Sequence, residues 1–331
     1  MRILHTSNTG LPDPRIEKTA LIMKRHGHDV VFLGGQPARR QDFHTFEETH
    51  YLPFVSTLRY ALDPRFRRRW LRAIDEIRPD VVHAHNITAA VPMLDSDYPT
   101  IYDDHEFWSR QVFRYRARGF LRRMAATPFA RKLKQWERLL LERYPVLTTS
   151  DNIANEHRKI ASFVGVTWNY PLRAEVEGLH PSGNREGFVY VGGDFRLRKF
   201  LPHRDMTGLD RVIQFDIISG LPHSEMMSRL LKYRFGLTPW RQHPIHKYCS
   251  PNRNYEYLHA GLPVIITDSL AHHLKGDPFV YPFSSYDEIP KVAEAASDAD
   301  PERIMEHARK KYVWDDQEPV ILEAYREAMK R

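Results

Sequence analysis

Short apolar runs alternate with amphipathic stretches along the chain, and this alternation predicts strands separated by helices. Residues 2–6 predict a strand, residues 13–26 a helix and residues 29–33 a second strand, so the chain opens with a strand–helix–strand unit. Further strands of the same half are expected at residues 80–85, 100–106 and 146–150. The pattern favours an α/β fold built on a doubly wound, Rossmann-like parallel sheet.

A change in composition separates this half of the chain from the next. Residues 168–187 are rich in Pro, Ser, Gly and Asn and have little periodic apolar content, which is typical of a linker. Beyond it, strands are expected at residues 187–191, 212–218, 235–238 and 262–267. A chain of 331 residues with 42% hydrophobic content can bury two cores, so we expect a second doubly wound domain.

One stretch of the second half, SPNRNYEYLHAGLPVIITD, predicts a capped helix followed by a buried strand. Ser250 is a good cap, Pro251 suits the first helical position, and Gly261 suits a left-handed stop, so we expect a helix over residues 251–260. The β-branched run at residues 262–266 is typical of a parallel strand. A loop followed by a helix N-terminus predicts an anion site.

Polar side chains gather at the ends of two predicted strands of the first half. His83, His85 and Asn86 follow one strand, and His105 and Glu106 follow the next. Ligands of open parallel sheets bind beyond the carboxyl ends of the strands, so we expect these residues to surround one cleft. Alternation along a strand places His83 and His85 on the same face.

The chain carries a formal net charge of +7, which suits nucleic acid, an anionic membrane or a phosphorylated substrate. Basic residues concentrate at residues 65–72 and 110–143, and the second segment interleaves them with aromatic and aliphatic residues. That segment is open to two interpretations. It is either an interfacial amphipathic surface or a solvated helix face whose apolar side packs on its own domain.

The sequence also bears on where the protein works. A single cysteine, Cys249, excludes an internal disulfide and a multi-cysteine metal site. No apolar run is long enough to span a membrane, and the N-terminus lacks a signal-peptide pattern, so we expect a cytoplasmic protein. Any membrane contact, at the inner face, would be peripheral.

Several motifs together resemble the GT-B nucleotide-sugar glycosyltransferases and, among them, the retaining family 4. They occur in the family order: GLPDPRIEKTALIMKRHGHDVVFLGG at residues 10–35, RPDVVHAHN at 78–86, YDDHEFW at 102–108, TWNYP at 167–171 and PNRNYEYLHAGLPVI at 251–265. The resemblance implies two Rossmann-like domains facing a central cleft. An acceptor-side domain is then expected at residues 1–170, a linker at 171–186, a nucleotide-sugar domain at 187–312, and a helix crossing back to the first domain at 313–331.

The resemblance also implies roles for individual residues. Donor binding is expected of Gly10, Arg196, Lys199, Ser250, Pro251, Asn252 and Glu256, with Glu256 on the ribose hydroxyls and the two cations on the phosphates. His105 is expected to be the catalytic residue beneath the donor sugar. The acceptor side is expected at His83, His85, Asn86 and Glu106. Tyr248 departs from the family, which often has a glutamate there for the sugar hydroxyls.

The function these residues predict is transfer of a sugar from a nucleotide-diphosphate sugar to a glycan, a lipid-linked molecule or a small molecule, with retention. No cofactor or metal is expected, because Asp103-Asp104 lies at a strand end with no surplus of carboxylates gathered nearby in the sequence. Three alternatives stay open: a non-catalytic partner subunit, an epimerase on the same fold, and a basic nucleic-acid-binding protein. The last lacks a recognisable nucleic-acid motif, so no nucleic-acid partner is expected.

Overall fold

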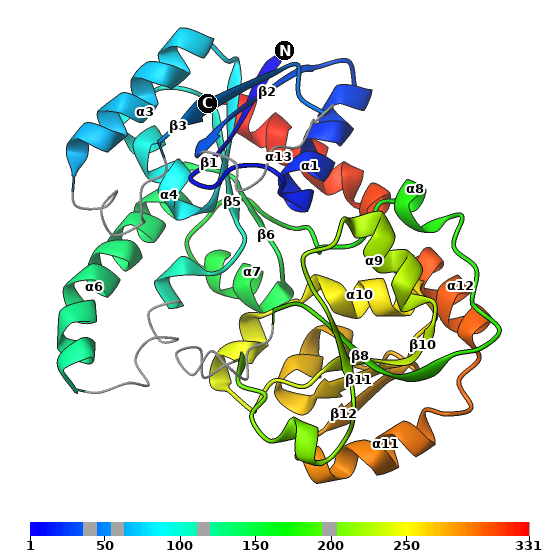
Figure 1. The fold of residues 1–331 in the computed structure, drawn as a ribbon. Coiled ribbons are helices and arrows are strands. Elements are labelled where there is room, and N and C mark those ends of the chain that lie inside the picture. Colours follow the sequence, from blue (N-terminus) through cyan, green and yellow to red (C-terminus); the bar gives the residue numbers. More distant parts are fainter. Residues whose placement is uncertain (36–44, 54–62, 111–119, 194–203, 331) are drawn as a thin grey trace. The chain divides into compact units, whose positions relative to one another are not determined.

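The structure is a computed structural model, and it describes the chain except for residues 36–44, 54–62, 111–119, 194–203 and 331. The chain divides into two compact units (Figure 1). Unit 1 contains Met1–Val112, Gly119–Thr167 and Asp316–Arg331, and unit 2 is built mainly from Trp168–Asp315. Each unit is described by itself.

Unit 1 is organised around a seven-stranded parallel sheet with the strand order β3-β2-β1-β4-β5-β6-β7. Its strands are β1 (Arg2–Ser7), β2 (Asp29–Gly35), β3 (Glu48–Leu52), β4 (Val81–His85), β5 (Thr100–Asp104), β6 (Val146–Thr148) and β7 (Val164–Val166). The chain reverses its direction of winding between β1 and β4, which is the switch point where doubly wound sheets bind ligands.

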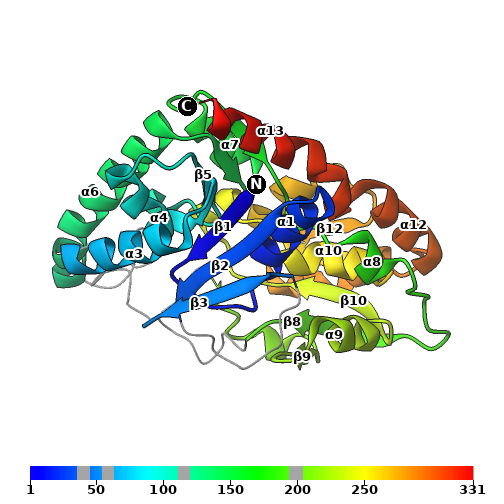
Figure 2. The same cartoon turned by 90° about the horizontal axis from the view of Figure 1, so that it is seen from above.

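The helices of unit 1 cover both faces of this sheet. They are α1 (Pro14–Arg25), α3 (Pro64–Ile77), α4 (Asn86–Ala90), α6 (Phe120–Arg143), α7 (Asp151–His157) and α13 (Glu318–Met329), with a 3-10 turn at Val91–Asp95. A further 3-10 turn, Trp314–Gln317, begins in unit 2 and ends in unit 1. In Figure 2, α3 and α6 lie on one side of the sheet and α1 and α13 on the other. Helix α13 packs on β5, β6 and β7, so the last residues of the chain complete unit 1.

Strand alternation decides which side chains each helix layer meets. Leu4, Val82 and Tyr102 belong to the hydrophobic core that also contains Trp70 of α3 and Leu140 of α6. The residues next to them in the strands point to the opposite face. That face receives polar side chains, which form the site described below.

Unit 2 holds a five-stranded parallel sheet with the order β12-β11-β10-β8-β9. Its strands are β8 (Glu186–Val191), β9 (Asp216–Ile218), β10 (Tyr233–Thr238), β11 (Val264–Thr267) and β12 (Val280–Phe283). Its helices are α8 (Arg173–Val176), α9 (His223–Leu230), α10 (Asn252–His259), α11 (Ile289–Ala295) and α12 (Pro301–Lys311), with 3-10 turns at Leu209–Arg211, Pro244–Tyr248, Asp268–Leu274 and Tyr286–Glu288. The predicted α/β class with two doubly wound sheets is confirmed.

Helix α10 is the predicted anion-binding helix, and its start differs from the prediction. Pro251 is the cap, and Ser250 lies one residue too early for its hydroxyl to reach a first-turn N–H. The Ser250 hydroxyl instead pairs with the Tyr255 hydroxyl at 3.0 Å. The predicted stop is confirmed, since Gly261 follows the helix with a φ of +72°. The N–H groups of the first turn therefore have no side-chain cap.

Candidate functional site

Four histidines from three adjacent strand ends of unit 1 lie together on the face that α13 covers. We call this group, with the acid and the tyrosine that contact it, the histidine cluster: His5, His83, His85, Asp103, His105 and Tyr325. Each lies on or just after β1, β4 or β5, apart from Tyr325 of α13. His105 retains 12% side-chain exposure, whereas the other three histidines and Asp103 are fully buried.

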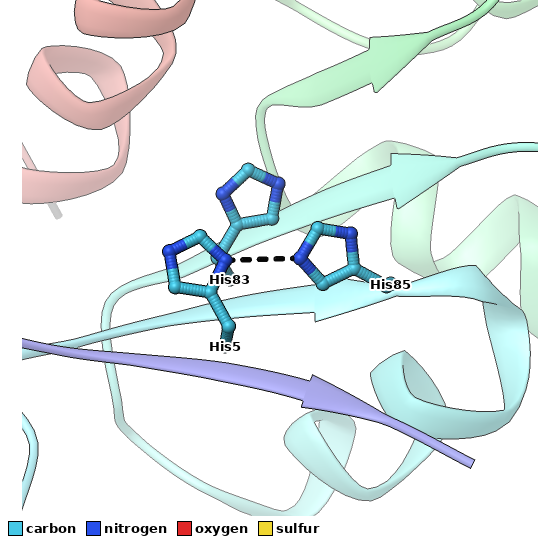
Figure 3. Close-up of side chains that lie close together, drawn as sticks. All are labelled: His5, His83 and His85. Atoms are coloured by element: carbon cyan, nitrogen blue, oxygen red, sulfur yellow. Dashed lines mark hydrogen bonds between the residues drawn. The ribbon is translucent and has the colours of Figure 1, made fainter. Parts of the chain in front are cut away.

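Within this cluster, the rings of His5, His83 and His85 lie close together and nearly parallel (Figure 3). The imidazoles of His83 and His85 stack with centroids 4.4 Å apart and an interplanar angle of 6°. His5 Nδ1 lies 3.0 Å from His85 Nε2, the hydrogen bond drawn in Figure 3. The predicted common face of His83 and His85 is thus observed, and His5 joins them from the neighbouring strand.

A buried ion pair anchors the cluster. Arg15, from the DPR stretch that opens α1, places Nη2 at 2.6 Å from Asp103 Oδ1 and Nε at 3.0 Å from Oδ2. It also donates to the carbonyl of Thr167 at 2.7 Å. Burial opposes ionisation of Asp103, but the charge of Arg15 and hydrogen bonds from His105 and His83 outweigh it and hold its pKa well below the usual range. Sequence reasoning gave Arg15 no role.

The buried histidines are neutral. Burial lowers the pKa of His83 and lowers those of His5 and His85 further, and neighbouring histidines add to the effect. A neutral imidazole has one donor nitrogen and one acceptor nitrogen. His5, His83 and His85 can therefore each both donate and accept a hydrogen bond.

A second buried pair holds the loop that carries His105. Asp104 accepts hydrogen bonds from the backbone N–H of Phe107 at 3.1 Å and from His157 Nε2 at 2.8 Å. Glu137 accepts from the backbone N–H of Ser109 at 3.0 Å. Burial and the charge of Asp104 raise the pKa of Glu137 to about 7. The carboxylates of Asp103 and Asp104 thus have separate protein partners.

The remaining predicted residues of unit 1 lie apart from the cluster's hydrogen bonds. Asn86 accepts a hydrogen bond from Trp108 Nε1 at 3.0 Å, and its φ is +67°. Glu106 is exposed and Gly10 is partly buried. His83 and His85 lie beneath the surface, so an acceptor-side role needs the partly buried Asn86 or the exposed Glu106.

Two sets of three side chains in unit 1 have the donor types of a metal site: His5, His83 and His85, and His85, Asp103 and His105. In the first set the rings are nearly parallel, and His5 Nδ1 and His85 Nε2 lie at hydrogen-bond distance, 3.0 Å apart. In the second set the donor atoms lie 3.1 to 3.4 Å apart, a separation that suits hydrogen bonds as well as coordination. Metal-independence stays a prediction.

In unit 2, Glu256 lies on α10 with its side chain 14% exposed. Its Oε1 is 3.4 Å from His223 Nε2, and the other ring nitrogen of His223 is 3.3 Å from Glu175 Oε1. Tyr248 and Ser250 are partly buried before the helix, and Asn252 is exposed. Arg196 and Lys199 lie outside the described residues, so their phosphate role stays a prediction.

Arg253 is a candidate that sequence reasoning missed. Its guanidinium lies over the rings of Tyr190 and Trp240, with distances of 4.6 and 4.9 Å to the two centroids. A Cβ on Gly192, whose φ is +137°, would be 3.3 Å from its Nη2. Nη1 is buried and has no hydrogen-bond partner among the described residues. A cation held by aromatic faces with an unused donor, in the first turn of a helix, suits an anionic ligand.

The sequence does contain a signal that could have drawn attention to Arg253. It stands inside the motif PNRNYEYLHAGLPVI, two positions after the expected helix start at Pro251. What no local pattern reveals is that β8 and the end of β10 bring Tyr190 and Trp240 beneath it.

Comparison with known proteins shows which family and which fold this chain resembles. Residues 18–163, less than half of the chain, match the family described as Glycosyltransferase Family 4. The structure resembles sucrose-phosphate synthase from Thermosynechococcus elongatus, with a TM-score of 0.67, 12% identity and 99% of each chain covered. The chain has the GT-B glycosyltransferase fold. No curated protein sequence matches it.

Other GT-B structures show how widely the fold is shared. Anabaena Alr3699/HepE in complex with UDP has a TM-score of 0.61, 10% identity and coverage of 98% of this chain and 99% of its own. A UDP-N-acetylglucosamine 2-epimerase has a TM-score of 0.59 and 11% identity, with 98% and 95% covered. The family match and the fold support glycosyl transfer. Among the described residues, no helix is both long and apolar enough to cross a membrane.

Proposed function

We propose that this GT-B protein transfers a glycosyl group from a nucleoside diphosphate sugar to an acceptor, with retention and without a metal. The observation that carries the proposal is the start of α10. There the backbone N–H groups have no side-chain cap, and Arg253 has a buried donor without a partner among the described residues. A diphosphate supplies the negative charge and the acceptor oxygens that both features lack.

The nucleoside is assigned to Glu256. Its carboxylate is on the second turn of α10 and can accept hydrogen bonds from two ribose hydroxyls. Its contact with His223 orients the carboxylate before the ligand arrives. Ser250, Pro251 and Asn252 belong to the same donor site, and Arg196 and Lys199 are proposed as further phosphate contacts.

His105 is proposed to contact the transferred sugar, and Asn86 and Glu106 the acceptor. His105 is the one histidine of the cluster with an exposed edge, and the fully buried Asp103 and His85 hold it. In this scheme the protein contributes positioning and electrostatics, and the leaving phosphate takes the acceptor's proton. Tyr248 replaces a common sugar contact of the family, so the identity of the sugar is open.

The first experiment measures binding of UDP, GDP, ADP and CMP sugars to the full chain by calorimetry, followed by product analysis. We expect saturable binding of one nucleotide class, transfer only when an acceptor is added, and the anomeric configuration of the donor in the product. Absence of binding to every nucleotide sugar would overturn the proposal. A sugar nucleotide altered without an acceptor would instead favour an epimerase, an activity found on this fold.

A non-catalytic partner subunit is the second alternative, favoured by Tyr248. It predicts nucleotide-sugar binding without turnover, and association with an active transferase. Turnover by the purified chain alone would exclude it. A Tyr248→Glu variant that gains activity would show that the missing sugar contact was the cause.

The acceptor is proposed to be a glycan or a lipid-linked molecule at an anionic membrane surface. In the described part of α6, Leu133, Trp136 and Leu140 are buried against unit 1's own core, while Arg131 and Lys134 are exposed. Over that part, most of the helix's apolar side is therefore used within the domain, and its charged residues and Leu139, which is 41% exposed, are available to a membrane. Arg114, Arg116 and Arg118 lie outside the described residues, and the side chains of Arg122 and Arg123 are not described. Sedimentation with anionic and neutral liposomes tests the contact.

A further inference from the structure

The hydrogen bonds of the histidine cluster have a direction that its chemistry determines. The chain of contacts ends at Asp103, an ionised carboxylate that can only accept. His83 Nε2 lies 3.3 Å from Asp103 Oδ2, so this nitrogen carries the proton of neutral His83. His83 Nδ1 is then an acceptor, and the Tyr325 hydroxyl, 2.9 Å away, donates to it.

The direction continues from the tyrosine to the exposed histidine. The Tyr325 hydroxyl uses its one proton in the hydrogen bond to His83, so its oxygen accepts a hydrogen bond from His5 Nε2 at 3.5 Å. His5 Nδ1 is then bare and accepts from His85 Nε2 at 3.0 Å. His85 Nδ1 is bare in turn and accepts from His105 Nε2 at 3.1 Å. Each step follows because a neutral imidazole carries one proton.

The opposite direction satisfies fewer contacts. If His85 carried its proton on Nδ1, it would donate to His105 and Asp103, and His5 would donate to His85. The contact between His5 Nε2 and Tyr325 would then have no proton, and the lone pair of His105 Nε2 would face the Asp103 carboxylate at 3.4 Å. The first direction leaves one such clash, between His85 Nδ1 and Asp103 Oδ2 at 3.4 Å.

We propose that this hydrogen-bond chain fixes His105 as the Nε2–H tautomer, so that its Nδ1 recognises a hydroxyl group of the ligand and not an anionic oxygen. His105 Nδ1 has no hydrogen-bond partner among the described residues, and the side chain is partly exposed. His5, His83, His85 and Tyr325 are positioning residues, because they act on the ligand only through His105. That the hydroxyl belongs to a sugar rests on the proposed function.

The test is nitrogen NMR of the full chain labelled at histidine, at about pH 8, where histidines with an ordinary pKa of about 6.5 are neutral. We expect His105 to be protonated on Nε2 and bare on Nδ1, with its signals identified by their loss in His105→Gln. The signals of His157, whose Nε2 contacts Asp104 at 2.8 Å outside the chain, serve as an internal reference for folding. A proton on His105 Nδ1 in the wild type would overturn the proposal.

Variants of His5 test whether the buried residues set this tautomer. His5→Leu removes the acceptor of the His85 Nε2 proton, so that proton should move to Nδ1, where Asp103 accepts it. His105 must then accept on Nε2 and carry its own proton on Nδ1. His5→Asn keeps a side-chain acceptor and should retain the wild-type tautomer. An unchanged tautomer in His5→Leu, with intact His157 signals, would overturn the proposal.

Tyr325→Phe removes a single hydroxyl and covers the case in which His5→Leu does not fold. Without the oxygen that accepts from His5, the two directions become comparable, and both tautomers of His105 should appear. Tyr144→Phe is the matched control, because Tyr144 is a buried tyrosine of the same unit whose hydroxyl donates to the Met93 carbonyl. A zinc or iron ion found by elemental analysis, with the cluster's nitrogens as ligands, would also overturn the chain.

A ligand titration separates this inference from the proposed function. Adding the nucleotide sugar identified by calorimetry should shift the His105 Nδ1 signal, whereas the matching nucleoside diphosphate should not. Binding without that shift would overturn the proposal that His105 Nδ1 recognises a ligand hydroxyl, whereas the tautomer pattern would still support the hydrogen-bond chain. Failure of every nucleotide sugar to bind would overturn both the proposed function and the assignment of a sugar hydroxyl to His105. The observed tautomer of His105 would then test the hydrogen-bond chain independently of any ligand.

Discussion

The histidine cluster of unit 1 and the start of α10 in unit 2 are both polar sites on doubly wound sheets. They differ in how completely the protein itself satisfies their hydrogen-bonding groups. In the cluster, Asp103 has Arg15, His83 and His105 as partners. At the start of α10, Arg253 keeps a buried donor without a partner among the described residues, and the first-turn N–H groups are not capped. The first arrangement is preorganised by the protein, whereas the second leaves donors that the described residues do not satisfy, as expected of the proposed ligand site.

The difference predicts where mutations act. Changes within the cluster should reach stability first, because they leave a buried charge or donor without its partner. Changes at α10 should leave stability nearly unchanged and act on binding.

Removing the cation of the buried pair should have the largest effect. Arg15→Met leaves the buried Asp103 carboxylate without its cation, and we expect a loss of about 3–5 kcal/mol in the free energy of unfolding. Urea denaturation measures it. The control Arg326→Met breaks an exposed pair with Glu323 and should cost less than about 1 kcal/mol. If Arg15→Met/Asp103→Asn is no more stable than Arg15→Met alone, lost packing and not the charge is the cause.

The second largest effect should be a loss of stability in acid that arises from the buried histidines of the cluster. The lowered folded-state pKa of His5 means that protons favour the unfolded chain, whose histidines titrate near about 6.5. The stability linked to His5 is therefore complete above that pH and declines below it. His5→Asn should reduce the loss by up to about 1.4 kcal/mol per pH unit, which urea titrations at several pH values measure. The exposed His180→Asn should not.

Glu137 should change the stability of the protein with pH in the opposite direction to His5, which makes this test sharper. Its pKa is raised to about 7, so the folded state binds the proton more tightly than the unfolded state. Its contribution to stability therefore grows as the pH falls from about 7 toward the ordinary glutamate value of about 4.3. Glu137→Gln should stabilise the protein most at high pH, and a pH-independent effect would contradict the buried-carboxylate explanation.

A binding effect with little change in stability is expected for Arg253. Arg253→Met should weaken binding of the nucleoside diphosphate by about 1.5–3 kcal/mol, the scale of a lost hydrogen bond to a charged group, and hardly affect the free nucleoside. Calorimetry with both ligands measures the difference. Arg229→Met, which breaks an exposed contact with Glu225 on α9, is the control. Equal losses for both ligands would assign Arg253 to folding.

The last prediction concerns the nucleoside. Glu256→Ala should weaken nucleotide binding by about 1–3 kcal/mol while the unfolding transition stays in place, with the exposed Glu225→Ala as control. Comparing ribose and 2′-deoxyribose nucleotides refines the test, because the variant should lose the discrimination between them. Retained discrimination would reject the ribose assignment.

Much of the fold could be predicted from local pattern. The strands at residues 80–85 and 100–106 were expected because their runs are short, β-branched and bounded by polar residues, and β4 and β5 begin and end within two residues of those bounds. Strand β3 was not predicted, since ETHYL is mostly polar and exposed at the edge of the sheet. Its position depends on pairing with β2, which no local pattern reveals.

The sites were predictable in part, and for a related reason. His83, His85 and His105 stood out because polar residues closed apolar strands. His5 did not, because a single histidine inside RILHTS reads as strand interior, and its partner His85 is 80 positions away. Arg253 was also missed, since what distinguishes it is the pair of aromatic rings beneath it.

The place of α13 has a consequence for how the protein is made. Strands β1 to β7 are complete by residue 166, but the helix that carries Tyr325 follows all of unit 2. At a synthesis rate of about 5–20 residues per second, the first sheet leaves the ribosome roughly 10–30 s before this helix exists. During that time His83 and His5 lack the hydroxyl that later joins them. The part of the sheet on which α13 packs, at β5, β6 and β7, thus stays uncovered until α13 has been made, and a chaperone can bind it during that time.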